Sequence, residues 1–346
     1  MAGKTEITLP LLKLGRLELD PALRDRQPGS AASGPVVTAT VPVPDAPTER
    51  TYAWEVAWSD AVRQAGQLGA DADTAEALAV GADKPLTGGT RVVVAADGEV
   101  LLGRWVSPGA GSTSVLVGPL PRLREVAAAT ARRPACVVVL ADRDGADVIV
   151  HASGDQPGQR FPVGLRPGEQ HDPHQGRPAG QLHGERHLTD HEPESGGRAN
   201  AEFIAGDRAP DGRDNHLGAA IGAALDEITS AATSAVGDLV AARAGEPGQG
   251  AVRGIQAVAD QLAEQQVAVL LVGPDVTGDA GSAYRIGSRP TEFLVGESDA
   301  GTEVPLADGL VWAALHQDAI VVQLPDRAGP LAGEPAAALL RRGAAS

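Results

Sequence analysis

Three histidines follow one another at intervals of four residues: His183, His187 and His191. They lie in a segment that holds most of the histidines of the chain. On a helix they would share one face, where neutral imidazoles can bind zinc. Gly184 and Pro193 disfavour a helix here, and the chain contains no His-Glu-x-x-His pattern. The pattern therefore favours a solvated histidine-rich loop, with a zinc site and a pH-sensitive contact surface as the alternatives.

Gly180 and Gln181 lie in the same segment, within Pro-Ala-Gly-Gln. A flexible glycine followed by an exposed glutamine could bring an amide or a backbone N–H to a reacting ester. There it could orient water or stabilise an oxyanion. Taken without further context, these residues are more typical of a loop turn.

Arginines of this segment are the candidate RNA contacts, because a guanidinium matches phosphate geometry. The candidates are Arg160, Arg166, Arg177, Arg186 and Arg198. The net charge of −16 argues against general nucleic-acid binding, DNA included, since counterion release needs clustered cations. Contact with a ribonucleoprotein would therefore depend on a local basic face.

The other reactive groups favour structural interpretations. Cys136 is the single cysteine, which excludes an internal disulfide, and its apolar run predicts a buried strand. Residues 109–111 and 245–250 are glycine turns without a dinucleotide or phosphate fingerprint. Asp142 and Asp144 fit a turn between two strands. No cofactor is expected.

The composition of the chain indicates how many domains position these residues and what their cores consist of. The chain has 346 residues and is 42% hydrophobic but only 3% aromatic, so two or three domains with aliphatic cores are expected. Its first residues lack the apolar core of a signal peptide, and no apolar stretch reaches the roughly 20 residues of a membrane span. These features predict a cytoplasmic protein.

Residues 1–34 read as an irregular N-terminal arm or a poorly packed lead-in. A first α/β domain is expected over residues 35–132. Its predicted elements are a strand at 35–41, a helix at 48–70, a hairpin at 91–102 with an Asp-Gly turn, a strand at 115–117 and a helix at 121–132.

A middle domain is expected over residues 133–216. It opens with a hairpin at 136–150, and residues 152–216 follow as a long loop or a disordered insertion rich in Gly, Pro, His and Arg.

Residues 217–346 form the third predicted part, in which helices and strands alternate as in a three-layer α/β/α sandwich. The expected helices lie at 217–243, 252–262, 308–317 and 335–342, and the expected strands at 267–272, 283–287, 292–295 and 320–322.

The order of segments resembles the archaeal–eukaryotic type of peptide-chain release factor, in its bacterial, actinobacterial form. The similarity rests on residues 88–100 and 119–123, on the turn at 142–147, and on residues 250–272, 307–310 and 339–341. The resemblance implies three α/β modules. The middle one would be RNase H-like and possibly truncated, and the last would have the fold of kink-turn-binding ribosomal proteins.

Release factors carry Gly-Gly-Gln in the middle domain, whereas this chain has Ala179 before Gly180 and Gln181. The family's members that lack the motif, such as the hibernation factor Balon, occupy the ribosomal A site beside elongation factor Tu. The resemblance therefore implies a ribosome-binding factor of hibernation or rescue, contacting rRNA and the tRNA site, rather than an enzyme. The alternatives are a peptidyl-tRNA hydrolase that uses Gln181 and a stress-linked interaction protein without a ribosomal role.

Overall fold

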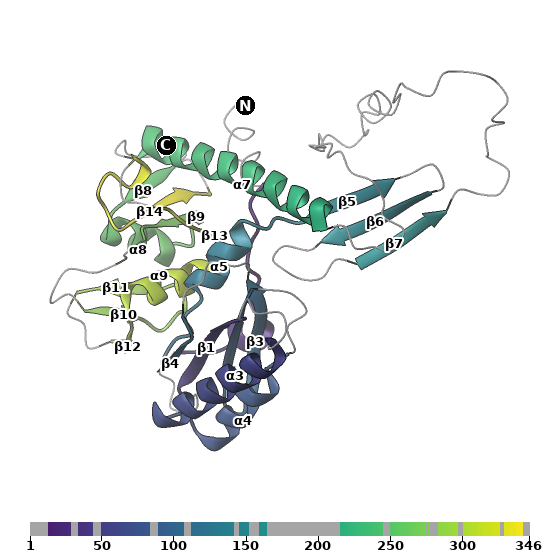
Figure 1. Cartoon of the computed structure of the whole chain (residues 1–346). Coiled ribbons are helices and arrows are strands. Elements are labelled where there is room, and N and C mark those ends of the chain that lie inside the picture. Colours follow the sequence, from purple (N-terminus) through teal and green to yellow (C-terminus); the bar gives the residue numbers. More distant parts are fainter. Residues whose placement is uncertain are drawn as a thin grey trace, which may run out of the picture. The chain divides into compact units, whose positions relative to one another are not determined.

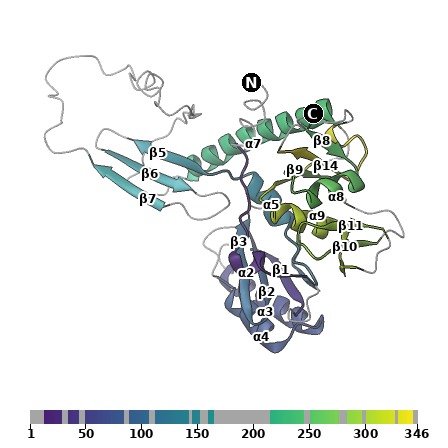
Figure 2. The same ribbon diagram turned by 180° about the vertical axis from the view of Figure 1, so that it is seen from behind.

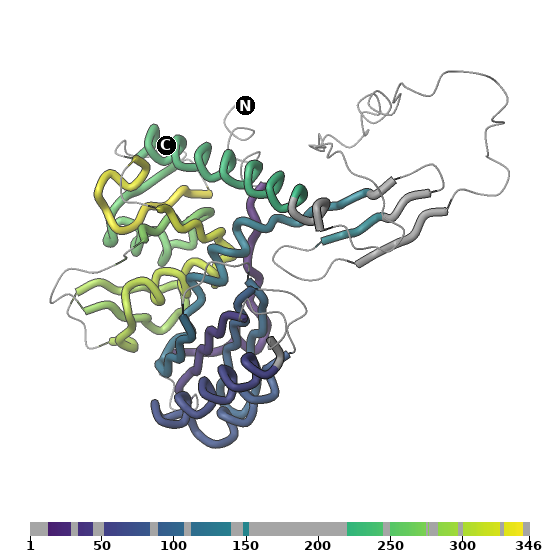
Figure 3. Tube along the Cα trace, viewed as in Figure 1, coloured from purple at the N-terminus to yellow at the C-terminus, as the bar shows by residue number. Residues whose placement is uncertain are grey.

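The computed structural model describes residues 13–28, 34–43, 50–83, 89–106, 112–141, 145–151, 159–164, 215–244, 250–274, 276, 283–296, 300–325 and 329–341 (Figure 1). Figure 3 follows the same chain as a Cα tube. Contacts divide the chain into two compact units. The first comprises residues up to Cys136, residues 151–158 and the chain from Leu225 onward, and the second comprises Val137–Val150 and Gln159–Ala224. Each is a mixture of helix and strand, as the sequence predicts.

The N-terminal module of the first unit is built on a four-stranded antiparallel sheet. Its strands are β1 (Val36–Pro42), β2 (Thr90–Ala96), β3 (Glu99–Val106) and β4 (Ser114–Gly118), in the order β3-β2-β1-β4. Asp97 and Gly98 join β2 to β3 with φ values of 52° and 78°. Positive φ at both positions fits a type I′ turn and confirms the predicted hairpin.

Two helices, α3 (Arg50–Gln67) and α4 (Ala72–Val80), cover one face of this sheet (Figure 1). Trp54 and Trp58 of α3 are buried against it, and the indole N–H of Trp58 donates to the carbonyl oxygen of Leu78 at 3.1 Å. The residue pattern predicts α3 but not α4. Helix α4 begins after its N-cap Asp71, whose carboxylate accepts a hydrogen bond from the backbone N–H of Thr74 at 2.7 Å.

Residues 13–28, called the strap below, are irregular except for the short helix α2 (Pro21–Arg24). Four strap leucines are nevertheless buried: Leu14, Leu17, Leu19 and Leu23. The last three share a buried cluster with Val92 and Leu102, on the sheet face away from α3, and α2 contacts β3 (Figure 2). The expectation of poor packing is therefore wrong for this stretch, because the leucines bury apolar surface without regular structure.

The C-terminal module is built on a second four-stranded sheet. Its strands are β8 (Ala251–Arg253), β9 (Val267–Val272), β13 (Ile320–Gln323) and β14 (Ala336–Leu340), in the order β13-β9-β14-β8. Only β13 and β9 are parallel. The helix predicted at 335–342 is wrong, since β14 occupies this place. Its Ala-Ala-Ala-Leu-Leu sequence favours a helix by propensity, but all five residues are buried in the middle of the sheet.

Helices lie on both faces of this sheet, which confirms the predicted three layers. Helices α8 (Ile255–Ala263) and α9 (Leu306–Leu315) share a buried cluster with Leu270 of β9. On the opposite face, Val236 of α7 (Asn215–Arg243) clusters with Leu271. Figure 1 shows α7 above the sheet and α8 and α9 below it.

Three smaller parts complete the described residues of the first unit. A three-stranded sheet in the order β11-β10-β12 is formed by β10 (Tyr284–Ile286), β11 (Phe293–Val295) and β12 (Thr302–Glu303), and it lies against α8 and α9. Helix α5 (Arg124–Ala131) follows β4 and packs on β13. A short 3₁₀ turn, Gly329–Leu331, precedes β14.

The described strands of the middle region form a sheet in the order β5-β6-β7, from β5 (Cys136–Ala141), β6 (Gly145–His151) and β7 (Gln159–Gly164). The hairpin of β5 and β6 is confirmed, whereas β7 lies within the stretch predicted as a loop. The prediction of a buried β5 is also wrong, because Cys136 is only half-buried and Val137 and Val139 are 59% and 57% exposed. The half-burial of Cys136 raises the pKa of its thiol.

No helix within the described ranges is both long and apolar enough to cross a membrane.

The buried leucines of the strap make a prediction about stability. Leu23→Ala removes a side chain that is fully buried, and it should lower the free energy of unfolding by about 2–5 kcal/mol through lost burial and a new cavity. Leu68→Ala, at a position 55% exposed, is the matched control and should change it by under about 0.5 kcal/mol. Denaturant unfolding measures both, and equal effects would contradict the packing of the strap.

Candidate functional site

Of the residues that the sequence analysis proposed as functional, the structure describes Arg160. It lies in β7, where the register places it opposite Ile149 of β6. The remaining candidates lie outside the described residues: Arg166, Arg177, Gly180, Gln181, His183, Arg186, His187, His191 and Arg198. The sequence interpretation of these residues therefore stays a prediction.

The polar contacts of the strap join it to several elements that the structure describes. At its start, the Gly15 N–H donates to the carbonyl oxygen of Ala131, at the end of α5, over 3.0 Å. A Cβ atom at Gly15 would lie 1.9 Å from the Thr130 carbonyl oxygen and 2.7 Å from that of Arg133. Only glycine therefore permits this close approach of two backbones.

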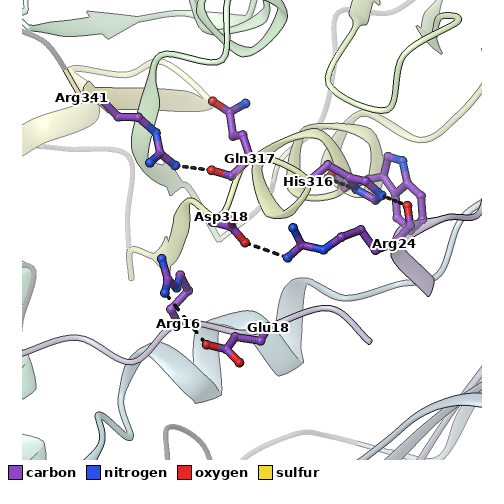
Figure 4. Close-up of polar contacts among 8 residues, drawn as sticks. Arg16, Glu18, Arg24, His316, Gln317, Asp318 and Arg341 are labelled. Carbon is purple, nitrogen blue, oxygen red and sulfur yellow. Dashed lines mark hydrogen bonds and ion pairs between the residues drawn. The ribbon is translucent and has the colours of Figure 1, made fainter. Parts of the chain in front are cut away.

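The strap reaches the C-terminal end of α9 through Arg24 and His316 (Figure 4). The Arg24 guanidinium contacts the carboxylate of Asp318 at 2.7 Å. The His316 ring lies between two carbonyl oxygens, with Nδ1 2.9 Å from that of Trp312 and Nε2 3.1 Å from that of Arg24. Arg24 thus contacts the helix end with its side chain and its backbone at once.

Asp318 is held in a left-handed conformation, with φ of 57°, directly after the helix ends. The hydrogen bond and charge of Arg24 lower the pKa of its carboxyl group, and the charges of Arg16 and Arg341 act in the same direction. The hydrogen bond with Asp318 raises the pKa of Arg24. Both side chains are about 40% exposed, so the ion pair contributes under about 1 kcal/mol and mainly sets the register of the contact.

Gln317, the residue between His316 and Asp318, is buried and joins three elements. Its amide oxygen accepts from the Val267 N–H at 2.9 Å, and its amide nitrogen donates to the carbonyl oxygens of Leu262 and Ala313 at 3.3 Å. Arg341 donates to the backbone oxygen of Gln317 and to that of Val267. The turn after α9 is therefore fixed to the ends of α8, β9 and β14.

The far end of the strap contacts the N-terminal module. Arg26 donates to the carboxylate of Asp97 and to the carbonyl oxygen of Gly34, and the Gly34 N–H donates to the same carboxylate at 3.0 Å. The hydrogen bond from Arg26 lowers the pKa of Asp97. The Thr302 hydroxyl of β12 donates to the Pro28 carbonyl oxygen at 3.1 Å. The strap therefore bonds to both modules of the first unit.

The other end of α9 carries a second ion pair. Asp308, in the first helical turn, is buried, and burial raises the pKa of its carboxyl group. The Arg122 guanidinium lies 3.9 Å from the Asp308 carboxylate. The backbone N–H of Arg122 donates to the Thr38 hydroxyl of β1 at 3.0 Å. Both ends of α9 thus face arginines from the N-terminal part of the chain.

The chemistry of this cluster is that of a structural joint. Within the described ranges, no group of three or more His, Cys, Asp or Glu side chains is placed to hold a metal ion.

A groove of about 700 Å³ between α5, α7 and β13 is lined by small and hydroxyl side chains such as Thr229, Ser230 and Thr233. On its rim, Asp226 pairs with Arg133 at 2.9 Å.

Comparisons with known proteins give three results. No protein-family model matches the chain, and no curated protein does. Among solved structures, Pelota from Archaeoglobus fulgidus is similar, with 15% identity, a TM-score of 0.32, and coverage of 75% of this chain and 81% of that one. The archaeal translation termination factor aRF1 is also similar, with 12% identity, a TM-score of 0.22, and coverage of 90% and 94%.

The close approach at Gly15 is testable. Gly15→Ala should lower the free energy of unfolding by about 1–3 kcal/mol, because the new methyl group overlaps backbone oxygens that cannot move independently. Gly66→Ala is the matched control, since a Cβ atom at Gly66 would meet nothing within 4 Å in the last turn of α3, and it should stabilise by up to about 1 kcal/mol. Thermal and denaturant unfolding measure both. A neutral Gly15→Ala would show that the strap does not hold this position.

Proposed function

We propose that this chain is a ribosome-associated translation factor of the release-factor-like family, which occupies the A site during hibernation or rescue. The carrying observation is the C-terminal module, a three-layer α/β/α sandwich on a mixed sheet in the order β13-β9-β14-β8. This is the architecture that the sequence resemblance implies for the third domain. The middle sheet β5-β6-β7 and the antiparallel N-terminal module precede it, in the order that the resemblance implies.

The proposed division of the chain keeps the predicted boundaries, 1–34, 35–132, 133–216 and 217–346. In this scheme the strap belongs to the first segment and serves as a joint. The middle domain is the proposed RNase H-like module, and β7 together with the segment after it carries the proposed contacts to rRNA and the tRNA site.

Charge restricts how such a factor can bind RNA. The net charge of −16 opposes any broad contact with phosphates. Binding must therefore use few arginines and fixed shape, and it should weaken only moderately with salt because few counterions are released. Arg160 is the proposed phosphate contact whose place in a strand is described. Elongation factor Tu is the proposed protein partner, and the cytoplasm is the proposed compartment.

Co-sedimentation with 70S ribosomes from starved cells tests the assignment. The wild-type chain should pellet with ribosomes, and Arg160→Glu should weaken binding and reduce the slope of log affinity against log salt by about one. Arg63→Glu is the control, since Arg63 is exposed on α3 and pairs only with Asp60 within the contacts described. Absence of the wild-type chain from the pellet at low and moderate salt would overturn the proposal.

The same family includes hydrolases, so peptide release is the second test. We expect no release of peptide from a peptidyl-tRNA complex above the uncatalysed rate, because Ala179 replaces the first glycine of the family's catalytic motif. Gln181→Ala should therefore leave the result unchanged. Release by the wild-type chain that is lost in Gln181→Ala would instead support peptidyl-tRNA hydrolysis.

A further inference from the structure

At the start of the strap, two positively charged side chains stand on either side of a fixed backbone contact. Lys13 and Arg16 flank Leu14 and Gly15 in the sequence. Leu14 and Leu17 are buried, whereas the side chain of Arg16 is 48% exposed and therefore faces outward. Because only glycine permits the close approach at Gly15, the backbone that carries both cations is held in place.

Two further arginines lie at the end of α5, where the strap contacts it. Arg132 is the C-cap of α5 and is exposed. The guanidinium of Arg133, the next residue, pairs with Asp226 of α7 at 2.9 Å. The Gly15 N–H donates to the carbonyl oxygen of Ala131, the last residue of α5. The backbones that carry the two pairs of cations are therefore in contact.

A fifth cation comes from the C-terminal module. Arg341 directly follows β14 and is exposed. The charges of Arg341 and Arg16 both act on the Asp318 carboxylate. In Figure 4, Arg16 and Arg341 lie on one side of Asp318 and Arg24 lies on the other. The positively charged side chains that gather here are called the basic patch: Lys13, Arg16, Arg132, Arg133 and Arg341.

The acidic side chains around the basic patch do not neutralise it. Glu18 lies 3.9 Å from Arg16 and is 78% exposed, so this ion pair is weak. Asp318 is already paired with Arg24 at 2.7 Å. Among the residues that the structure describes, Lys13 and Arg132 have no acidic partner within 4.0 Å. Positive charge is therefore in local excess, in a chain whose net charge is −16.

We propose that the basic patch binds the phosphate backbone of RNA. The inference rests on the proposed function, because an acidic chain can bind a ribonucleoprotein only through a local basic face. All but one of its side chains are arginines, whose planar guanidinium can donate to two phosphate oxygens at once. The patch belongs to the first unit, so it adds RNA contacts to the one proposed for Arg160 in the second.

The scaffold of the basic patch favours binding. The strap, the end of α5 and the end of β14 are held by buried leucines, by the contact at Gly15 and by backbone hydrogen bonds. Arg341 also donates to the carbonyl oxygen of Val267 at 3.0 Å, which fixes the direction of its side chain. Because these backbones are fixed before RNA arrives, less conformational freedom is lost on binding than for cations on a flexible segment.

Salt-dependent co-sedimentation with 70S ribosomes from starved cells tests the patch. The double variant Arg16→Gln/Arg132→Gln neutralises two exposed side chains. Loss of two phosphate contacts should weaken binding about tenfold at about 0.1 M salt and reduce the slope of log affinity against log salt by about two. Arg63→Gln/Arg289→Gln is the matched control, since it changes the net charge equally at two exposed arginines outside the patch, and it should bind as the wild type does.

The outcomes separate the patch from the proposed function. Unchanged affinity and slope in Arg16→Gln/Arg132→Gln, or an equal loss in both double variants, would overturn the patch while ribosome binding stands. Absence of the wild-type chain from the pellet would overturn the proposed function and the patch with it. Both double variants should unfold at the denaturant midpoint of the wild type, which excludes misfolding as the cause of a loss.

Crosslinking of the wild-type complex identifies the partner without any variant. Ultraviolet light should attach nucleotides to peptides within residues 13–16 or 130–133, and nucleotides attached only elsewhere would contradict the proposal. The competing partner is an acidic protein surface, since guanidinium groups also bind carboxylates. A carbodiimide-induced link between Lys13 and a carboxylate of a ribosomal protein would therefore decide against RNA.

Discussion

Helix α9 is the element on which the first unit depends, because it is apolar on all sides and is buried almost completely. A helix of this kind is stable only when other elements enclose it. The sheet of the C-terminal module and α8 cover part of its surface, and Leu17, Leu19 and Leu23 of the strap belong to the same buried cluster. The N-terminal part of the chain therefore contributes to the core of a module that lies almost 300 residues later.

Apolar and polar contacts have different roles in this joint. Burying a leucine contributes a few kcal/mol, whereas a half-exposed ion pair contributes under about 1 kcal/mol. The leucines therefore supply most of the free energy that holds the strap. Arg24, Arg26 and Arg122 instead fix which residues face one another, with each guanidinium opposite one aspartate. The leucines thus supply the free energy that holds the strap, and the arginines determine which residues face one another.

Much of the fold follows from local patterns. The apolar run at Val267–Val272 predicts a buried strand, the Asp-Gly pair at residues 97–98 predicts a hairpin, and the spacing of Trp54 and Trp58 predicts a helix. Each of these signals depends on neighbours in the sequence. They predict the strands and the first helix of the N-terminal module and the three layers of the C-terminal module, whereas the strand order of each sheet comes from the structure.

The misses have physical causes. Residues 152–216 have too few apolar residues to indicate a strand, yet β7 forms at the edge of the described sheet, where its Pro162 is tolerated. The strap leucines follow neither a helical nor a strand period, so no pattern revealed their burial. The cluster at His316 joins residues 292 positions apart, a distance that no local pattern spans. The predicted site residues other than Arg160 lie outside the described ranges, so the sequence argument for them is untested.

The position of β14 has a consequence for how the protein is made. This strand pairs with β9 on one side and with β8 on the other, so it separates two strands that precede it by more than 60 residues. A growing chain cannot join β8 to β9 until residues 336–340 have left the ribosome and entered between them. The C-terminal module must therefore fold after its own synthesis is nearly finished, whereas the N-terminal sheet can close much earlier.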